Sequence, residues 1–217
     1  VLAGGDVRAS TGISANITPG SFSDDRSDAR ANAAANPLGP GEPGTNPTYA
    51  KGALVAAAIA PGLAPFAAAR VGIGSKFEAG LAYTGRGVRV DVRRGFGDGA
   101  WTYSAGVGGS ATLYGRQQGT ELPNVALGAL NGYGADVPLL AGWQSPAGLY
   151  ELWFGARGGF EHISIEELRS EPKSVPLGVA PISLDANRFY GGAVAGFAVG
   201  FKHVHVALEG SVSYQVV

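Results

Sequence analysis

The chain contains no cysteine and carries little charge. Without Cys, neither a disulfide framework nor a thiolate metal site can form. Charged residues make up 15% of the sequence, whereas about 25% is usual in a soluble domain. The formal net charge is -1, so no basic field is present to attract nucleic acid. We therefore expect no nucleic-acid partner and no cysteine-bound metal.

A long apolar run and an initiating methionine are also missing. The mean hydropathy is +0.10, but no run of roughly 18 apolar residues occurs, so we expect no transmembrane helix. The chain opens on Val1-Leu2-Ala3 without a signal peptide, which indicates a processed or trimmed form. We expect residues 1–217 to form a single domain. Glycine, in contrast, is abundant, with 36 residues against about 7% on average.

The most regular pattern lies between residues 86 and 114. Valines alternate with charged residues over 88–93, Gly-Asp-Gly interrupts the pattern at 97–99, and a second alternation of apolar and small polar residues runs over 101–113. Successive side chains of a strand point to opposite faces, so this pattern predicts a β-hairpin with one apolar face. Its second strand is far longer than the ~5–6 residues typical of soluble sheets. It exceeds the ~9–11 residues that a tilted strand needs to cross a bilayer.

Alternation recurs along most of the chain. We expect further strands over 5–17, 76–83, 128–143, 149–164, 188–201 and from Val204 onward. Long alternating segments, little charge and abundant glycine are typical of an antiparallel transmembrane β-barrel, and we expect one of about ten strands (8–10). A soluble β-sandwich is the alternative. In the barrel the lipid-facing residues would include Val88, Val90, Val92, Phe154, Phe197 and Val206.

Proline-rich segments without periodicity predict long loops over 18–48, 115–127 and 165–187. A short helix fits inside the first, over Asp24–Ala35. Residues 49–73 are ambiguous: alanine favours a helix over 53–60, but the flanking pattern favours one kinked strand, or two strands, with a break or bulge at Pro61 and Pro65. Pro138 likewise predicts a bulge.

Strand counting leaves one question open. One kinked strand over 49–73 puts all long loops on one side and all tight turns on the other, as in outer-membrane barrels. It also gives an odd count of about nine strands, whereas bacterial barrels are usually even. Either a closing strand lies beyond Val217, or 49–73 is two strands.

The segment from Arg70 to Leu81, RVGIGSKFEAGL, resembles a hairpin found in many small bacterial outer-membrane β-barrel proteins. The resemblance implies a Gram-negative outer-membrane location, aromatic girdles and a glycine-rich lumen. It also implies contact with outer-membrane lipid and lipopolysaccharide, and leaves room for protein partners at the long loops. It implies no activity, because this broad group includes porin-like pores, adhesins, anchors and enzymes. The chain ends on Val217 rather than on the terminal Phe common in the group, which suggests a missing C-terminus.

Charged residues of alternating sign collect on the expected lumen face. They are Arg70, Lys76, Glu78, Arg89, Asp91, Arg93, Glu151, Arg157, Glu161, His205 and Glu209. They could line a narrow polar channel, with the lumen glycines leaving a thin water path. The favoured interpretation is a salt-bridged polar core, because barrels of about eight strands are filled by side chains and large pores need ~16. We therefore expect a non-enzymatic structural or anchoring barrel, or a narrow pore, with little conductance.

The segment His162-Ile163-Ser164 supports a different function. A His and a Ser two residues apart share a strand face, as a general base and its nucleophile could, and Glu166 or Glu167 could orient the His. The pair is similar to the His-x-Ser of outer-membrane lipid A deacylases, although the Ile-Glu-Glu that follows departs from that family. A polar strand end at the level of lipid headgroups is the competing interpretation. His203 and His205 lack an evident third ligand, and a metal site needs three or four; no metal or other cofactor is expected.

Overall fold

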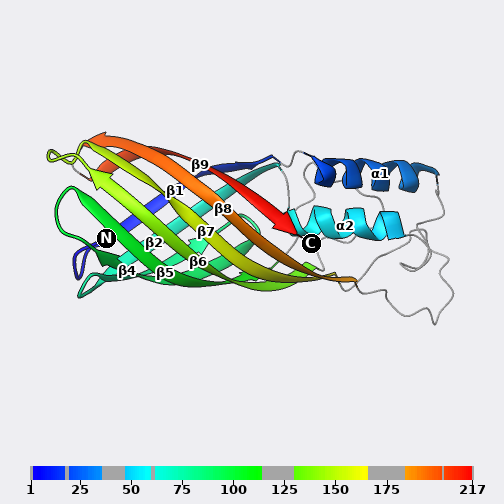
Figure 1. Ribbon diagram of the computed structural model, residues 1–217, viewed down its shortest axis with the longest axis horizontal. Coiled ribbons are helices and arrows are strands. Elements are labelled where there is room, and N and C mark those ends of the chain that lie inside the picture. The colour runs from blue at the N-terminus through cyan, green and yellow to red at the C-terminus, as the bar shows by residue number, and fades with distance from the viewer. Residues whose placement is uncertain are drawn as a thin grey trace.

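The strands follow one another around a single curled sheet. The computed structural model describes residues 2–17, 20–35, 47–59, 62–113, 130–165, 184–201 and 203–216. Within them nine strands pair antiparallel in sequence order (Figure 1). They are β1 (Val7–Asn16), β2 (Gly62–Gly74), β3 (Phe77–Tyr83), β4 (Gly87–Phe96), β5 (Trp101–Thr112), β6 (Leu130–Gln144), β7 (Tyr150–Ile165), β8 (Leu184–Phe201) and β9 (Val204–Val216). The expected all-β, antiparallel, barrel-like fold is confirmed.

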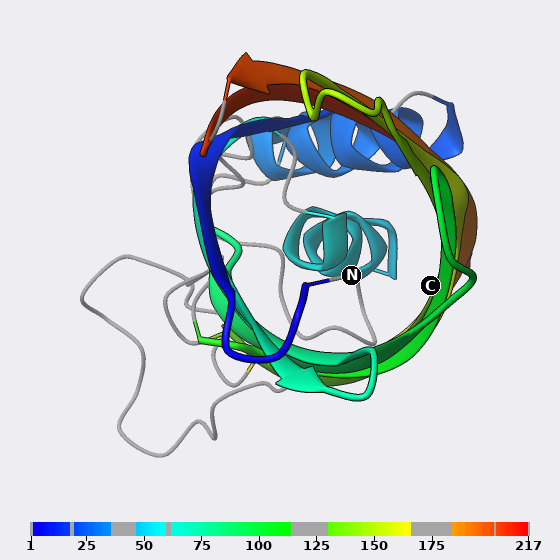
Figure 2. The same ribbon diagram turned by 90° about the vertical axis from the view of Figure 1, so that its left-hand side faces the viewer.

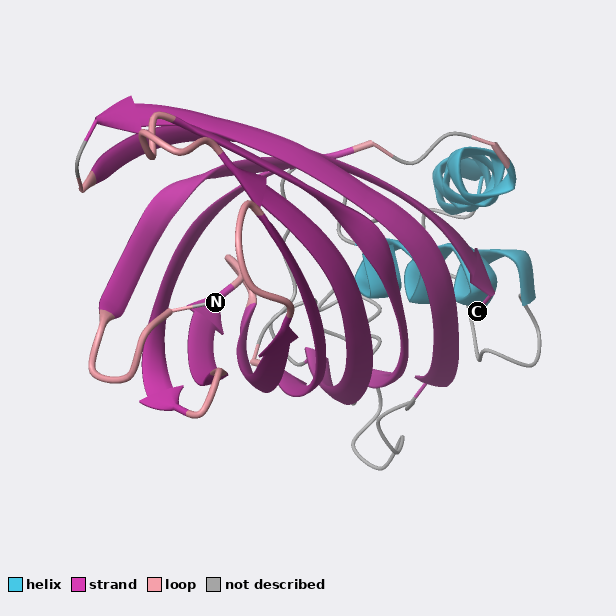
Figure 3. Ribbon diagram, turned by 60° about the vertical axis from the view of Figure 1, so that its left-hand side comes forward, coloured by secondary structure: helices cyan, strands magenta, loops and turns pink. Residues whose placement is uncertain are grey.

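Two helices, α1 (Ser21–Ala35) and α2 (Pro47–Ile59), lie beyond one end of the curl (Figures 1 and 3). The helix predicted inside the first long loop is confirmed by α1. The strand preferred for 49–73 is wrong over its first half, because α2 occupies it and β2 begins only at Gly62. Alanine is the strongest helix former, and α2 also packs against α1, β7 and β8.

The connections at one end of the sheet are all short, whereas those at the other end are long except for residues 84–86 between β3 and β4. Residues 75–76, 97–100 and 145–149 form tight turns at the end opposite the helices, which we name the turn end. Glycines with positive φ, such as Gly74 (102°) and Gly97 (89°), make these turns possible. The strand ends next to the long connections lie at the other end, which we name the helix end. The positions of the turns over 75–76, 97–100 and 145–149 agree with the predicted asymmetry, and the short connection 84–86 at the helix end departs from it.

Proline affects the ladders less than expected. The pairing of β5 with β6 keeps one register on both sides of Pro138, and only the rungs beside it are missing. The pairing of β1 with β2 runs in unbroken register through Pro65. The bulge predicted at Pro138 and the break or bulge predicted at Pro65 are therefore wrong: each residue removes one N–H donor without inserting an extra residue. Pro61 lies outside the described residues. The register shift that does occur lies between Gly72 and Gly74.

The curled sheet has two free edges. No ladder joins β1 to β9 within the described ranges. Antiparallel pairing reverses direction at each step, so β1 and β9 both run from the turn end to the helix end. Seen from the turn end, the strands form a ring with α2 across its far side (Figure 2).

The outer face of the sheet is apolar. The residues predicted to face outward do so: Val88, Val90, Val92, Phe154, Phe197 and Val206 are between 37% and 77% exposed. Outward aromatic residues gather near the strand ends. They are Phe77, Phe96, Trp101, Tyr103, Trp143 and Tyr150 near the turn end, and Tyr83, Tyr133, Phe160, Phe189 and Tyr214 near the helix end. Between them the outward residues are mainly Val, Ala and Leu.

Candidate functional site: a charged lumen capped by a helix

A continuous network of ion pairs crosses the inner face of the sheet, from β2, β3 and β4 to β6 and β7. In order of contact it runs Arg93, Glu78, Arg70, Asp91, Arg89, Asp136 and Arg157. Strand alternation places all of them inward. The inside of the curl therefore holds alternating cations and anions rather than a hydrophobic core.

The carboxylates sit at the branch points of this network. Asp136 accepts from Arg89 at 2.7 Å and 2.8 Å and from Arg157 Nη2 at 2.6 Å. Asp91 accepts from Arg89 and, at 2.8 Å, lies in an ion pair with Arg70 Nη2. Each of these two acids therefore bridges a pair of arginines from different strands.

Glu78 anchors the end of the network nearest the N-terminus. Its carboxylate pairs with Arg93 and lies 3.1 Å from Arg70 Nη1. The backbone N–H of Leu2 donates to the other oxygen at 2.9 Å. Arg70 Nη1 makes no hydrogen bond within the described residues, so its contact with Glu78 is electrostatic rather than directional. The N-terminal segment is thereby fixed inside the turn end of the ring (Figure 2).

Because these ion pairs are buried, breaking one of them costs much stability. The side chains of Glu78, Asp91 and Asp136 are 0%, 3% and 2% exposed. Charges removed from water lose several kcal/mol of solvation, and removing one partner of a buried pair costs about 3–5 kcal/mol. The network is therefore stable only while its members remain paired.

Glycines on the inner face give the large side chains room to lie flat. A Cβ on Gly108 would come within 2.5 Å of the Arg89 guanidinium, and one on Gly196 within 2.4 Å of the Trp153 ring. The rings of Tyr190 and His205 approach Gly159 and Gly200 in the same way. Side chains therefore lie over several of the lumen glycines.

A second cluster lies at the helix end. Glu161 pairs with Arg188 and, at 3.4 Å, with Arg86, and it accepts from Thr112 Oγ1 at 3.0 Å. Both arginines also donate to the backbone of α2: Arg86 Nη1 lies 2.6 Å from the carbonyl oxygen of Ala57. Further donations from Arg86 and Arg188 reach Ala58 O, each at 2.9 Å.

This cluster caps α2 electrostatically. The helix has no basic residue in its last turn, although the carbonyl end of a helix carries partial negative charge and favours cations. The barrel supplies Arg86 and Arg188 instead, and Glu161 holds both arginines in place. We call Glu161, Arg86 and Arg188 the latch.

At the strand tips around the latch the polarity of the two faces is the opposite of that in the rest of the sheet: the inward side chains are apolar and the outward ones are polar. The inward residues Leu130, Ile163 and Ile165 are fully buried and form a hydrophobic cluster with Val55 and Ala58 of α2. The outward residues on the same tips are polar. Two rows of cross-strand neighbours carry them, namely Asn131, Ser164 and Asp185, and Tyr133, His162 and Asn187. The tips therefore have an ordinary water-facing exterior around a hydrophobic interior.

The other expected lumen residues make separate contacts near the turn end. Glu151 pairs with Arg8 at 3.2 Å, and Trp153 Nε1 donates to Glu209 at 2.7 Å. His205 Nε2 lies 3.2 Å from Gly148 O. The prediction that Lys76 faces the lumen is wrong. Lys76 lies in the 75–76 turn with a φ of 62°, and its side chain pairs with Asp98 at 2.6 Å.

Several residues of the network and the latch were not predicted from the sequence. Asp136 and Arg188 occupy inward positions between apolar outward residues, so the strand alternation that located Arg89 could have found them. Arg86 lies in the connection between β3 and β4, where no periodicity exists. Only the position of α2 shows what Arg86 contacts.

His162 and Ser164 share the outward face of β7, as expected. His162 Nδ1 lies 3.0 Å from Asn187 Oδ1, and its ring lies 5.1 Å from that of Tyr133. Among the described residues, no hydrogen bond joins His162 to Ser164. Glu166 and Glu167 fall outside the described residues. His162 is therefore held by Asn187, and a base–nucleophile contact of the kind that activates serine is not formed.

Comparisons with models of protein families, with curated proteins and with solved structures find no match to this chain. No helix within the described residues is long and apolar enough to cross a membrane.

Proposed function

We propose that the protein is a membrane-spanning outer-membrane β-barrel with an occluded polar lumen, serving as a structural or anchoring barrel. The observation that carries this proposal is the inverted distribution of polarity: an ion-paired interior inside an exterior of exposed Val, Leu and aromatic side chains. In water, a contiguous apolar face of this kind causes association. In a bilayer it is the surface that a barrel presents to lipid, with aromatic residues near both interfaces.

The reversal at the helix end supports a membrane boundary there. Below it, outward residues such as Phe160 and Phe189 are apolar; beyond it, the outward residues are His162, Ser164 and Asn187. Hydrocarbon disfavours such polar groups unless they are satisfied. We infer that the tips of β6, β7 and β8, together with α1 and α2, project into water on the side of the long connections.

A membrane-spanning barrel also needs closed edges, because open strand edges do not occur in hydrocarbon. β1 and β9 run in the same direction, so one strand antiparallel to both would close the ring. That strand would run from the helix end to the turn end and bring the count to ten. The even number agrees with bacterial barrels.

Two measurements test the proposal. The refolded protein should float with liposomes through a density gradient after a high-salt wash, and it should require detergent to remain monodisperse. In planar bilayers it should conduct weakly or not at all, because the network and α2 fill the lumen. A monodisperse protein in detergent-free buffer contradicts the membrane location, and a large steady conductance contradicts the occluded lumen.

A lipid-modifying hydrolase is the second candidate. It is favoured by the position of His162 and Ser164 on the outward face at the inferred boundary, where a lipid substrate could reach them. Mass spectrometry of lipid A from cells with and without the protein tests it. If lipid A loses an acyl chain in cells with the unmodified protein but keeps it in cells with Ser164→Ala, the protein is a hydrolase. That result would overturn the purely structural role.

A further inference from the structure

One cation stands apart on the apolar outer face. The registers of the nine strands place Arg94 outward on β4, opposite Phe77 on one side and Ala105 on the other. Among the described strands, the other fully charged outward residue is Asp185, which lies on the polar tips at the helix end. Arg94 is therefore an exception to the chemistry of the surface around it.

Aromatic rings hold this side chain, and no acid neutralises it. The Arg94 Cζ lies 5.3 Å from the centroid of the Phe77 ring and 5.4 Å from that of Phe96. The residue is exposed. Every inward arginine of the lumen network has a carboxylate partner, whereas Arg94 has none among the residues that the structure describes. An exposed guanidinium with aromatic support can bind an oxyanion bidentately.

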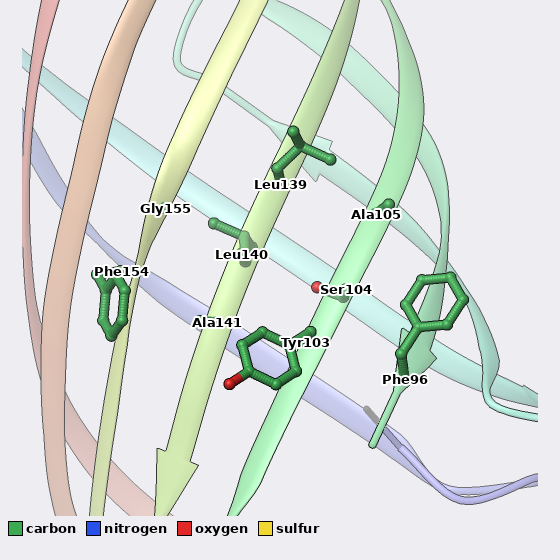
Figure 4. A pocket seen from close by; sticks show the side chains of 9 residues that line it. All are labelled: Phe96, Tyr103, Ser104, Ala105, Leu139, Leu140, Ala141, Phe154 and Gly155. Carbon is green, nitrogen blue, oxygen red and sulfur yellow. The ribbon is translucent and has the colours of Figure 1, made fainter.

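A hollow in the outer face begins beside Arg94. It has a volume of about 350 Å³ and lies over β4 to β7 (Figure 4). Ala105 and Ala141 form its floor, and Phe96, Tyr103 and Phe154 rise around it. Ala105 is the direct cross-strand neighbour of Arg94, and such neighbours have Cβ atoms about 4.5–5.5 Å apart. Arg94 does not line the hollow itself, but it is the cross-strand neighbour of Ala105 and contacts Phe96, both of which do.

We propose that Arg94 and this hollow form a binding site for one anionic phospholipid, which places its phosphate on Arg94 and an acyl chain over Ala105 and Ala141. The proposal rests on the proposed membrane location. The charge selects the occupant: an acyl chain satisfies the hollow, but only an anionic headgroup also neutralises Arg94. A second copy related by a two-fold axis would present the same patch, in which no described residue supplies an anion for Arg94.

Native mass spectrometry of the detergent-solubilised protein tests the site. The protein is mixed with phosphatidylglycerol, phosphatidylcholine or glycerol 3-phosphate, and retained ligand is counted on the folded species. The unmodified protein should retain phosphatidylglycerol about five-fold more than phosphatidylcholine, as expected for one cation near an anionic headgroup. Glycerol 3-phosphate alone should not be retained, since it has no acyl chain; its retention would overturn the lipid assignment.

Three variants and one control variant sharpen the result. Arg94→Gln should remove the preference for phosphatidylglycerol, and Arg94→Lys should retain part of it, which separates charge from folding. Ala141→Phe should fill the hollow and reduce retention of both lipids. Lys76→Gln is the matched control, because this turn-end cation is already paired with Asp98 and does not line the hollow; it should behave as the unmodified protein. An unchanged preference in Arg94→Gln overturns the site, whereas failure of the protein to float with liposomes overturns the membrane location independently.

Discussion

Arg89 holds Asp136 by two parallel hydrogen bonds, Nε to Oδ2 at 2.8 Å and Nη2 to Oδ1 at 2.7 Å, across strands that are 47 residues apart in the chain. Two parallel hydrogen bonds fix the orientation of the guanidinium plane relative to the carboxylate plane, which a single hydrogen bond would not do. Arg89 also pairs with Asp91 and Asp136 also pairs with Arg157. The pair is therefore the junction between the β4 half of the lumen network and the β7 half.

Asp136→Asn should destabilise the barrel. It keeps the size of the side chain but leaves Arg89 and Arg157 without their shared anion. Breaking a buried pair costs about 3–5 kcal/mol, and we expect about 3 kcal/mol because Arg157 is 44% exposed and regains water. The change in the free energy of unfolding is measured by urea unfolding in detergent micelles, with the heat-dependent shift in gel mobility as the signal of the folded state. Asp98→Asn, which breaks an exposed pair with Lys76, serves as the control; equal losses in the two variants would contradict a buried network.

Arg89→Ala together with Arg93→Ala should change permeability as well as stability. These two side chains neutralise Glu78, Asp91 and Asp136 and also cover Gly108 and Gly106. Their removal leaves excess negative charge in a widened lumen, which favours cations. We expect a cation-preferring leak in planar bilayers, read from the reversal potential in a salt gradient. An anion preference, or an unchanged barrier, would show that these arginines do not occlude the lumen.

The strands could be predicted because alternation is a local property. Over 86–114, each face has a consistent composition, so the hairpin, its turn and the direction of each side chain follow from the sequence alone. The same reasoning placed Arg70, Glu78, Asp91 and Arg157 inward. It could not foresee their partners, because contacts such as Arg89–Asp136 depend on the curl and on the register of intervening strands.

α2 shows where local reasoning fails. The alanine-rich segment fits a helix by propensity and a strand by its flanking pattern, and the sequence offers nothing local to decide between them. The decisive contacts are distant: Val55 and Ala58 bury against Ile163 and Ile165, and Arg86 bonds the end of the helix. The bulge predicted at Pro138 is wrong for a different reason: the missing N–H interrupts the ladder but adds no residue to the strand.

Gly196→Ala should destabilise the barrel through a steric clash. Its Cβ would lie 2.4 Å from two atoms of the Trp153 ring, and the ring cannot move freely because Nε1 donates to Glu209 at 2.7 Å. Overpacking of this kind costs about 1–3 kcal/mol, measurable by urea unfolding, with a change in tryptophan fluorescence. Gly191→Ala is the matched control on the same strand, because nothing lies within 4 Å of its added Cβ. Equal stability of the two variants would mean that Trp153 does not lie over Gly196.

Glu161→Gln should release the latch without unfolding the barrel. The carboxylate holds Arg86 and Arg188 against the carbonyl end of α2; a neutral amide holds them less tightly, and the two cations then repel each other. The helix should detach and unfold more often, which makes the backbone at Lys51, whose side chain is already 66% exposed, a better substrate for trypsin. Limited proteolysis of the protein in liposomes, with cleavage sites assigned by mass spectrometry, should show faster cutting at Lys51. Thr112→Val removes only the neutral hydrogen bond to Glu161 and should have a smaller effect. If Glu161→Gln leaves the cleavage rate unchanged, the hydrophobic contacts of Val55 and Ala58 alone hold α2 on the barrel.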